Sequence, residues 1–181
     1  MSAINLPFVA RTLKPLTALA VLALIFGTLD IVDALLFWGL SMDVAPVHIF
    51  QGIASGVLGS TAFHAGAASA ALGAAIHYSG YFCLLGLYYL ALVKFPVLTR
   101  QPYAWGLLYG LVTYLVIHYL ILPMSAYHIV AGFYLAGFIN AFLAQTAFMG
   151  AACAFLGHEL HSKEKSPARE MSEVQHASPS R

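Results

Sequence analysis

The chain has 181 residues, of which 61% are hydrophobic and 8% are charged, and its formal net charge is +1 at pH 7. Soluble domains carry roughly 25% charged residues. Fifteen charged side chains are too few to cover a soluble domain of this length, so the composition indicates an all-α integral membrane protein whose main partner is the lipid bilayer. The sequence contains no basic patch for nucleic acid and no P-loop, GxGxxG, GxSxG or HExxH motif. Nucleic-acid binding and catalysis of the soluble-enzyme type are therefore not expected.

Four apolar segments are long enough to cross a bilayer, which takes about 20 helical residues. The first follows Arg11 and Lys14, and no small-residue cleavage site comes after it, so we interpret it as a retained span rather than a signal peptide. Together the spans form one membrane domain over 1–158, followed by a polar cytoplasmic tail at 159–181. The four spans are predicted at 17–40, 67–93, 102–124 and 130–157.

The ambiguous segment is 46–64, which is nearly long enough to span but contains several polar residues and glycines. The placement of basic residues decides how it is interpreted, because Lys and Arg are absent from 15–93 and from 101–162. With four spans, all basic residues fall on one side of the membrane, as the positive-inside rule requires. A fifth span at 46–64 would place the basic residues on both sides of the membrane. We therefore expect an interfacial or re-entrant helix on the outer face, and both chain termini in the cytoplasm.

Small residues recur at four-residue spacing in the second and third predicted spans. They include Gly66, Ala70 and Ala74 in the second span and Gly106 and Gly110 in the third. Such ridges let helices approach closely in lipid, so they predict a compact bundle.

Each predicted span carries a strongly polar side chain at nearly the same depth. The estimate uses the helix rise of about 1.5 Å per residue, counted from the nearest basic residue on the cytoplasmic side. On this scale Asp30 and Asp33 lie about 24 and 28 Å from Lys14, and His77 lies about 26 Å from Lys94. His118 lies about 27 Å from Arg100, and Gln145 lies about 27 Å from Lys163. Asn140 lies about one helical turn further out than Gln145.

These polar side chains are expected to point inward, since a charged group at the bilayer centre costs roughly 2.5–3.5 kcal/mol on insertion scales. The prediction is a buried cluster in the outer half of the membrane, covered by the segment 46–64. Its members are Asp30, Asp33, His77, His118, Gln145 and Asn140, and the covering segment contributes Gln51 and His64.

Three interpretations of this cluster stay open. In the first, Asp30 and Asp33 share one helix face and hold a proton or pair with an imidazole, so that the protein handles protons, an ion or a small solute. A homo-oligomer or a larger membrane complex would then complete the pathway. In the second, the cluster only joins helices in a structural or accessory subunit. In the third, Asp30, Asp33, His77 and His118 bind a metal such as Zn, Mn or Fe, although no HxxxH or ExxH spacing supports it. No other cofactor is expected.

Residues 25–125 resemble a group of small uncharacterised bacterial inner-membrane proteins and, more loosely, the YagU-like family. The resemblance rests on a histidine in one span, a "KFP" loop, and paired glycines, a polar residue and a proline in the next span. It implies a multi-span protein of the bacterial inner membrane and adds no specific activity. The matching residues here are His77, Lys94–Pro96, Gly106, Gly110, His118 and Pro123.

Overall fold

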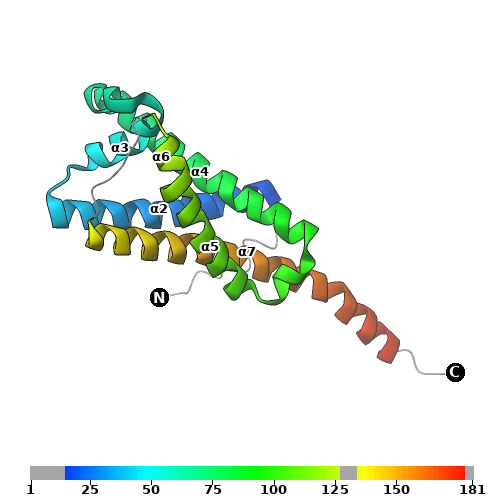
Figure 1. Ribbon diagram of the computed structural model, residues 1–181. Helices are drawn as coiled ribbons and strands as arrows, with labels where there is room; N and C mark the ends of the chain where they lie inside the picture. Colours follow the sequence, from blue (N-terminus) through cyan, green and yellow to red (C-terminus); the bar gives the residue numbers. More distant parts are fainter. Residues whose placement is uncertain (1–14, 127–133, 178–181) are drawn as a thin grey trace, which may run out of the picture.

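The computed structural model describes residues 15–126 and 134–177, with side chains described as far as Ser162. Every regular element in these ranges is helical. The long helices run side by side in an elongated bundle, and the last helix projects beyond it at the C-terminal end (Figure 1). The basic residues expected before the first span and residues 130–133 of the last predicted span lie outside the described residues.

Four helical stretches are long and apolar enough to cross a membrane, which confirms the predicted four-span, all-α architecture. The last of them belongs to α7, which continues as a helix to Ala177. The third is interrupted by a π-helical segment near its end, and it stops at Met124, directly after Pro123. The first two stretches are α2 (Pro15–Met42) and α4 (Gly66–Lys94). The third stretch, Pro102–Met124, comprises α5 (Pro102–Val116), a π-helix (Ile117–Ile121) and α6 (Leu122–Met124). The fourth is the part Leu135–Ser162 of α7 (Leu135–Ala177).

The segment 46–64 forms a short helix at one end of the bundle, as predicted. Helix α3 (Pro46–Leu58) has 13 residues, fewer than the 20 or so that a span needs, and a 3₁₀ turn (Gly59–His64) follows it. It packs across the first turns of α4, where a side-chain carbon at Gly73 would overlap the backbone of Phe50. This contact needs glycine and fixes α3 against α4.

Glycine also allows the closest helix pair, α5 and α7. A Cβ atom at Gly106 would lie 2.5 Å from the Gly150 carbonyl oxygen, and one at Gly110 would lie 2.6 Å from the Thr146 carbonyl oxygen. Backbones can approach this closely only where side chains are absent. The small residues predicted to form a packing ridge in the third span therefore do form one, against α7.

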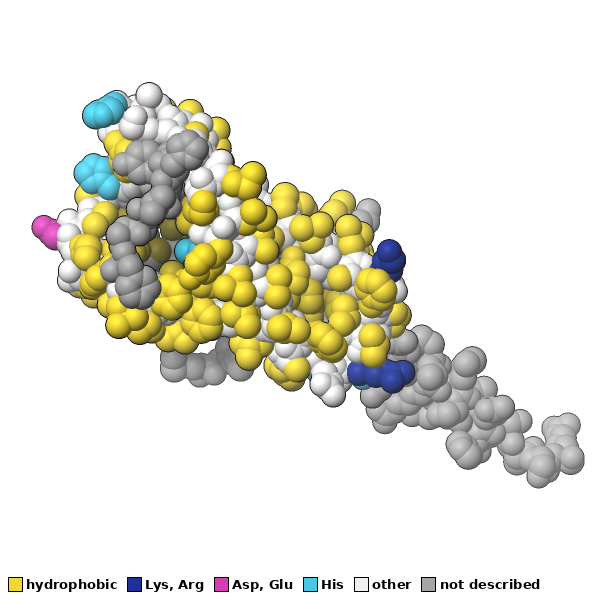
Figure 2. Space-filling model, viewed as in Figure 1, with side chains coloured by type: hydrophobic (Ala, Val, Ile, Leu, Met, Phe, Trp, Pro, Cys, Tyr) yellow, Lys and Arg dark blue, Asp and Glu magenta, His cyan; other side chains and the backbone are white. Residues whose placement is uncertain are grey.

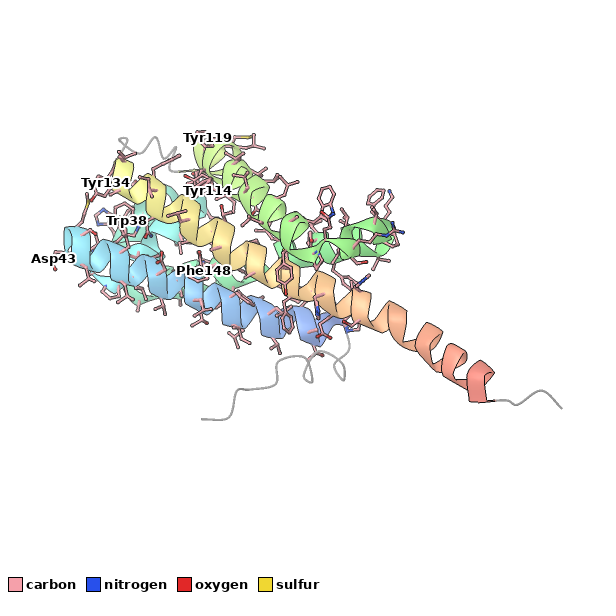
Figure 3. All side chains as sticks on the ribbon, turned by 90° about the horizontal axis from the view of Figure 1, so that it is seen from below. Trp38, Asp43, Tyr114, Tyr119, Tyr134 and Phe148 are labelled. Atoms are coloured by element: carbon pink, nitrogen blue, oxygen red, sulfur yellow. The ribbon has the colours of Figure 1, made fainter. Side chains whose placement is uncertain are left out.

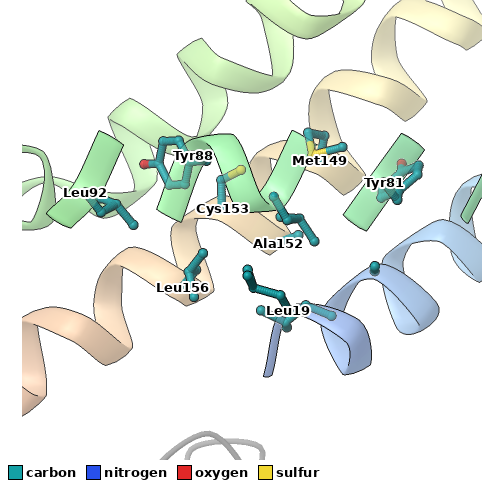
Figure 4. Close-up of a cluster of buried hydrophobic side chains, with 11 residues drawn as sticks. Leu19, Tyr81, Tyr88, Leu92, Met149, Ala152, Cys153 and Leu156 are labelled. Carbon is teal, nitrogen blue, oxygen red and sulfur yellow. The ribbon is translucent and has the colours of Figure 1, made fainter. Parts of the chain in front are cut away.

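The hydrophobic core lies among α2, α4 and α7, in the half of the bundle nearest the loop between α4 and α5 (Figure 4). The outward faces of the helices carry exposed leucines such as Leu24, Leu107 and Leu143, as expected for surfaces that contact lipid. We call the buried set the hydrophobic cluster: Leu19, Leu22, Ala23, Tyr81, Leu85, Tyr88, Leu92, Met149, Ala152, Cys153 and Leu156.

The two ends of the bundle differ in charge (Figure 2). Lys94 and Arg100 lie at what we call the basic end, and Thr99 Oγ1 lies 3.4 Å from His161 Nδ1 of α7 there. Asp43 and the histidines His48 and His64 are exposed near the opposite end, which we call the α3 end. The charge segregation expected from the sequence is therefore present in the described residues.

Candidate intramembrane polar site

The clearest polar contact inside the bundle joins α2 to α7. Asn140 donates a hydrogen bond from Nδ2 to Asp33 Oδ2 over 2.7 Å, and both side chains are half-buried. The two residues are 107 positions apart in sequence, so only the tertiary fold brings them together. The contact brings these two polar groups of the first and last spans side by side.

A second contact joins α2 to α4. His77 Nε2 lies 2.8 Å from the Gly27 carbonyl oxygen. A carbonyl oxygen only accepts hydrogen bonds, so Nε2 carries the hydrogen and Nδ1 is left to accept or release a proton. The helices approach closely at this point, because a Cβ atom at Gly27 would lie 3.2 Å from the Tyr78 ring. Next to it, Thr28 Oγ1 and the Tyr78 hydroxyl lie 3.0 Å apart.

Asp30 lies between these two contacts. Its carboxylate is half-buried and interacts electrostatically with His77, Asp33 and Tyr81. The Tyr81 hydroxyl is buried beside Asp30, but it makes no hydrogen bond of normal geometry with any described residue. A buried hydroxyl without a partner loses free energy unless a water or ligand satisfies it. Asp30, Asp33, His77, Tyr81 and Asn140 are the polar cluster.

His118 belongs to a different environment. It lies in the π-helical segment, where Nδ1 donates to the Tyr114 carbonyl oxygen at 3.1 Å and the imidazole stacks on the Tyr114 ring at 4.1 Å. Tyr114 in turn packs edge-on against Phe138 and Phe142 of α7. Asn140 lies between these two phenylalanines in sequence, about 200° around the helix from each. His118 is therefore at the predicted depth but on the other face of α7.

The remaining predicted residues contribute less to the polar cluster. Gln145 is half-buried, and its Nε2 atom is buried with no hydrogen-bond partner among the described residues. Gln51 of α3 is buried and donates from Nε2 to the Gly66 carbonyl oxygen at 3.1 Å, which ties α3 to the start of α4. His64 is exposed at the α3 end.

The side chains described by the structure include no group of three or more His, Cys, Asp or Glu residues placed to hold a metal ion. The set Asp30, Asp33, His77 and His118 is divided by α7, and His77 uses Nε2 on a backbone carbonyl. Within the "HELH" stretch, Glu159 is buried and His158 is exposed.

Aromatic side chains also pack α2 against the start of α7, near Asn140. The rings of Phe37 and Trp38 meet edge to face at 5.2 Å, and the ring of Tyr134, directly before α7, lies 6.0 Å from that of Trp38 (Figure 3). Trp38 packs over Gly137, one turn from Asn140. Trp38 therefore packs α2 against α7.

Sequence reasoning missed Tyr81 and Gly27 as members of the site. Tyr81 follows His77 by four residues and so lies on the same face of α4, which is a usable signal. The role of Gly27 depends on its backbone carbonyl, and no residue-type pattern indicates that role.

Comparison with known proteins gave no matching family model, no matching curated protein and no matching solved structure. The resemblance to the YagU-like family therefore stays a prediction. The chain is a polytopic membrane protein with four candidate spans on the grounds of its own helices.

Proposed function

We propose that this membrane protein binds and moves protons, alone or coupled to a small ion or solute, at the polar cluster. The observation that supports this most strongly is that Asp30 and His77, halfway along the neighbouring helices α2 and α4, are near enough to interact electrostatically. Ionisable side chains inside a membrane span cost free energy and are typical of proton and ion pathways. Two such groups near each other on neighbouring helices fit a transfer step better than a single isolated group does.

The chemistry follows from the properties of these two neighbouring groups. Because Nε2 of His77 is held by the Gly27 carbonyl, Nδ1 is the ring atom that takes up and releases a proton. Asp30 then stabilises the imidazolium or accepts the proton itself. Asp33 is held by Asn140 and supplies a second carboxylate close to Asp30 on the same face of α2.

Proton flux into proteoliposomes tests the proposal. A potassium gradient with valinomycin supplies the driving force, and an internal pH-sensitive dye reports acidification. Asp30→Asn keeps the shape of the side chain and removes its titration, so we expect flux to fall about tenfold or more. The matched control is Asp43→Asn, at an exposed carboxylate outside the spans where asparagine also tolerates the positive φ of 52°. Wild-type flux equal to that of empty liposomes, or Asp30→Asn flux equal to wild type, would refute the proposal.

A structural or accessory subunit is the second candidate, and the hydrogen bonds themselves favour it. Asn140–Asp33 joins α2 to α7, and His77–Gly27 joins α2 to α4. Such bonds stabilise membrane bundles by roughly 0.6 kcal/mol each on average. This candidate predicts that Asp30→Asn lowers thermal stability in detergent and that the wild type shows no flux.

We further propose that the protein lies in a bacterial inner membrane with its basic end in the cytoplasm. The positive-inside rule supports this orientation, since Lys94 and Arg100 share one end and no described Lys or Arg lies at the other. Labelling of intact cells at Ser60→Cys but not at Gln101→Cys is the expected result, and the reverse pattern would overturn it. The predicted homo-oligomer stays a prediction that chemical cross-linking in membranes would test.

A further inference from the structure

The formal charges of the four spans are distributed unevenly along the bundle. The candidate spans contain only Asp30, Asp33, Lys94 and Glu159 as formally charged side chains. Lys94 and Glu159 lie near the basic end, so the polar cluster carries carboxylates without a Lys or Arg partner on any described span. A site with this charge attracts cations and repels anions.

The bundle is tightly packed on the basic side of the polar cluster. Leu85, Met149 and Cys153 are completely buried there, at 0% exposure each, and Leu19 and Leu92 are nearly so. These side chains fill the space among α2, α4 and α7 from the level of Tyr81 to the basic end (Figure 4). Packing of this kind leaves no polar path for a hydrated ion.

On the side of the α3 end, α3 packs tightly on the start of α4, but the described residues of α2 and α7 are less completely buried. No residue of α2 beyond Ile31 is buried, and between 135 and 148 of α7 the only buried residue is Gly137. Asp30, Asp33, His77 and Asn140 are all half-buried. In a bilayer the exposed part of a carboxylate has to face water or a polar partner, because exposure to lipid is costly. The end of α2 at Met42, on the side of the α3 end, lies about 14 Å from Asp33 along the helix.

From these three observations we infer that the polar cluster is a site for a small cation that enters from the α3 end only, with the hydrophobic cluster closing the way to the basic end. This inference rests on the proposed function for its ligand site, and it adds the charge of the ligand and the side of the membrane from which the ligand arrives. Lys94 and Arg100 at the basic end repel cations, which adds to the preference for entry from the α3 end.

Cysteine labelling in proteoliposomes tests the inference without any need for transport. The two native cysteines, Cys83 and Cys153, are first replaced by serine and alanine, and Asn140→Cys then reports access to the polar cluster. Ser60→Cys and Gln101→Cys mark the α3 end and the basic end, since both positions are exposed. Methanethiosulfonate reagents that do not cross membranes, one cationic and one anionic, are added to each side in turn. Asp33→Cys is the second reporter for the case that Asn140→Cys does not fold.

The expected result is that Asn140→Cys reacts from the side that labels Ser60→Cys, at least about tenfold faster than from the side that labels Gln101→Cys. The ratio of the cationic to the anionic labelling rate should be about 25-fold higher at Asn140→Cys than at Ser60→Cys, because one unit charge close by in water changes the two rates about fivefold each, in opposite directions. Asp30→Asn should reduce that preference. In a variant that keeps only native Cys153, the thiol should react from neither side.

Reaction of Asn140→Cys from the basic side, from both sides equally or from neither side would overturn the inference, as would labelling of Cys153. Equal reaction with the cationic and the anionic reagent would refute the inference that the ligand is a cation. One-sided labelling without proton flux would refute the proposed function and leave the one-sided cation site standing. Proton flux together with labelling from neither side would refute the one-sided cation site and leave the proposed function standing.

Discussion

The contact between α5 and α7 gives a prediction whose size follows from measured distances. Replacing Gly106 by alanine places a methyl group 2.5 Å from the Gly150 carbonyl oxygen and 2.7 Å from the Ala154 nitrogen. Both distances are roughly 1 Å shorter than a normal contact. The atoms that must move belong to the backbone of α7, so no side-chain rotation relieves the overlap. The helices have to separate along their length.

We expect Gly106→Ala to destabilise the protein by about 1–3 kcal/mol relative to Gly86→Ala, the range for overpacked sites. Gly86 is the matched control, because a Cβ atom there would meet nothing within 4 Å. Both substitutions gain the same helix propensity, about 1 kcal/mol, so the difference between the two variants isolates the contact.

Thermal unfolding in one detergent, followed by size-exclusion chromatography of the heated samples, measures the difference. A gap of several degrees between the two midpoints is expected, from roughly 2–4 °C per kcal/mol for chains of this length. Equal midpoints for Gly106→Ala and Gly86→Ala would show that α5 and α7 do not meet through this glycine, and would refute the packing described for the third and fourth spans.

Two further predictions concern the polar cluster. A double-mutant cycle of Asp33→Leu and Asn140→Leu should give a coupling free energy of about 1 kcal/mol in unfolding measurements, because the 2.7 Å hydrogen bond between the two side chains is lost in either single variant. A coupling near zero would show that this hydrogen bond does not form. Tyr81→Phe should lower proton flux severalfold, since its hydroxyl lies beside Asp30. The control Tyr88→Phe removes an equally buried hydroxyl without a partner in the described part of the chain, so it should leave flux unchanged and raise stability by about 1 kcal/mol. Equal flux in both variants would exclude Tyr81 from the site.

The sequence by itself determined the number of spans, their approximate ends and the short helix at 46–64. Each of these depends on quantities that run along the chain: hydropathy over about 20 residues and the positions of Lys and Arg. A fixed rise per residue placed Asn140 about one turn further out than the other polar groups, and the fold brings it to Asp33.

Only the tertiary structure decided which of these residues share a site. Depth does not give the rotation of a helix about its own axis, and rotation is set by packing, such as the glycine contacts that bring α5 against one face of α7. His118 therefore stacks on Tyr114 on that face, while Asn140 points from the opposite face to Asp33. The partner of His77 is a backbone carbonyl, which every residue possesses, so no side-chain pattern singles out Gly27.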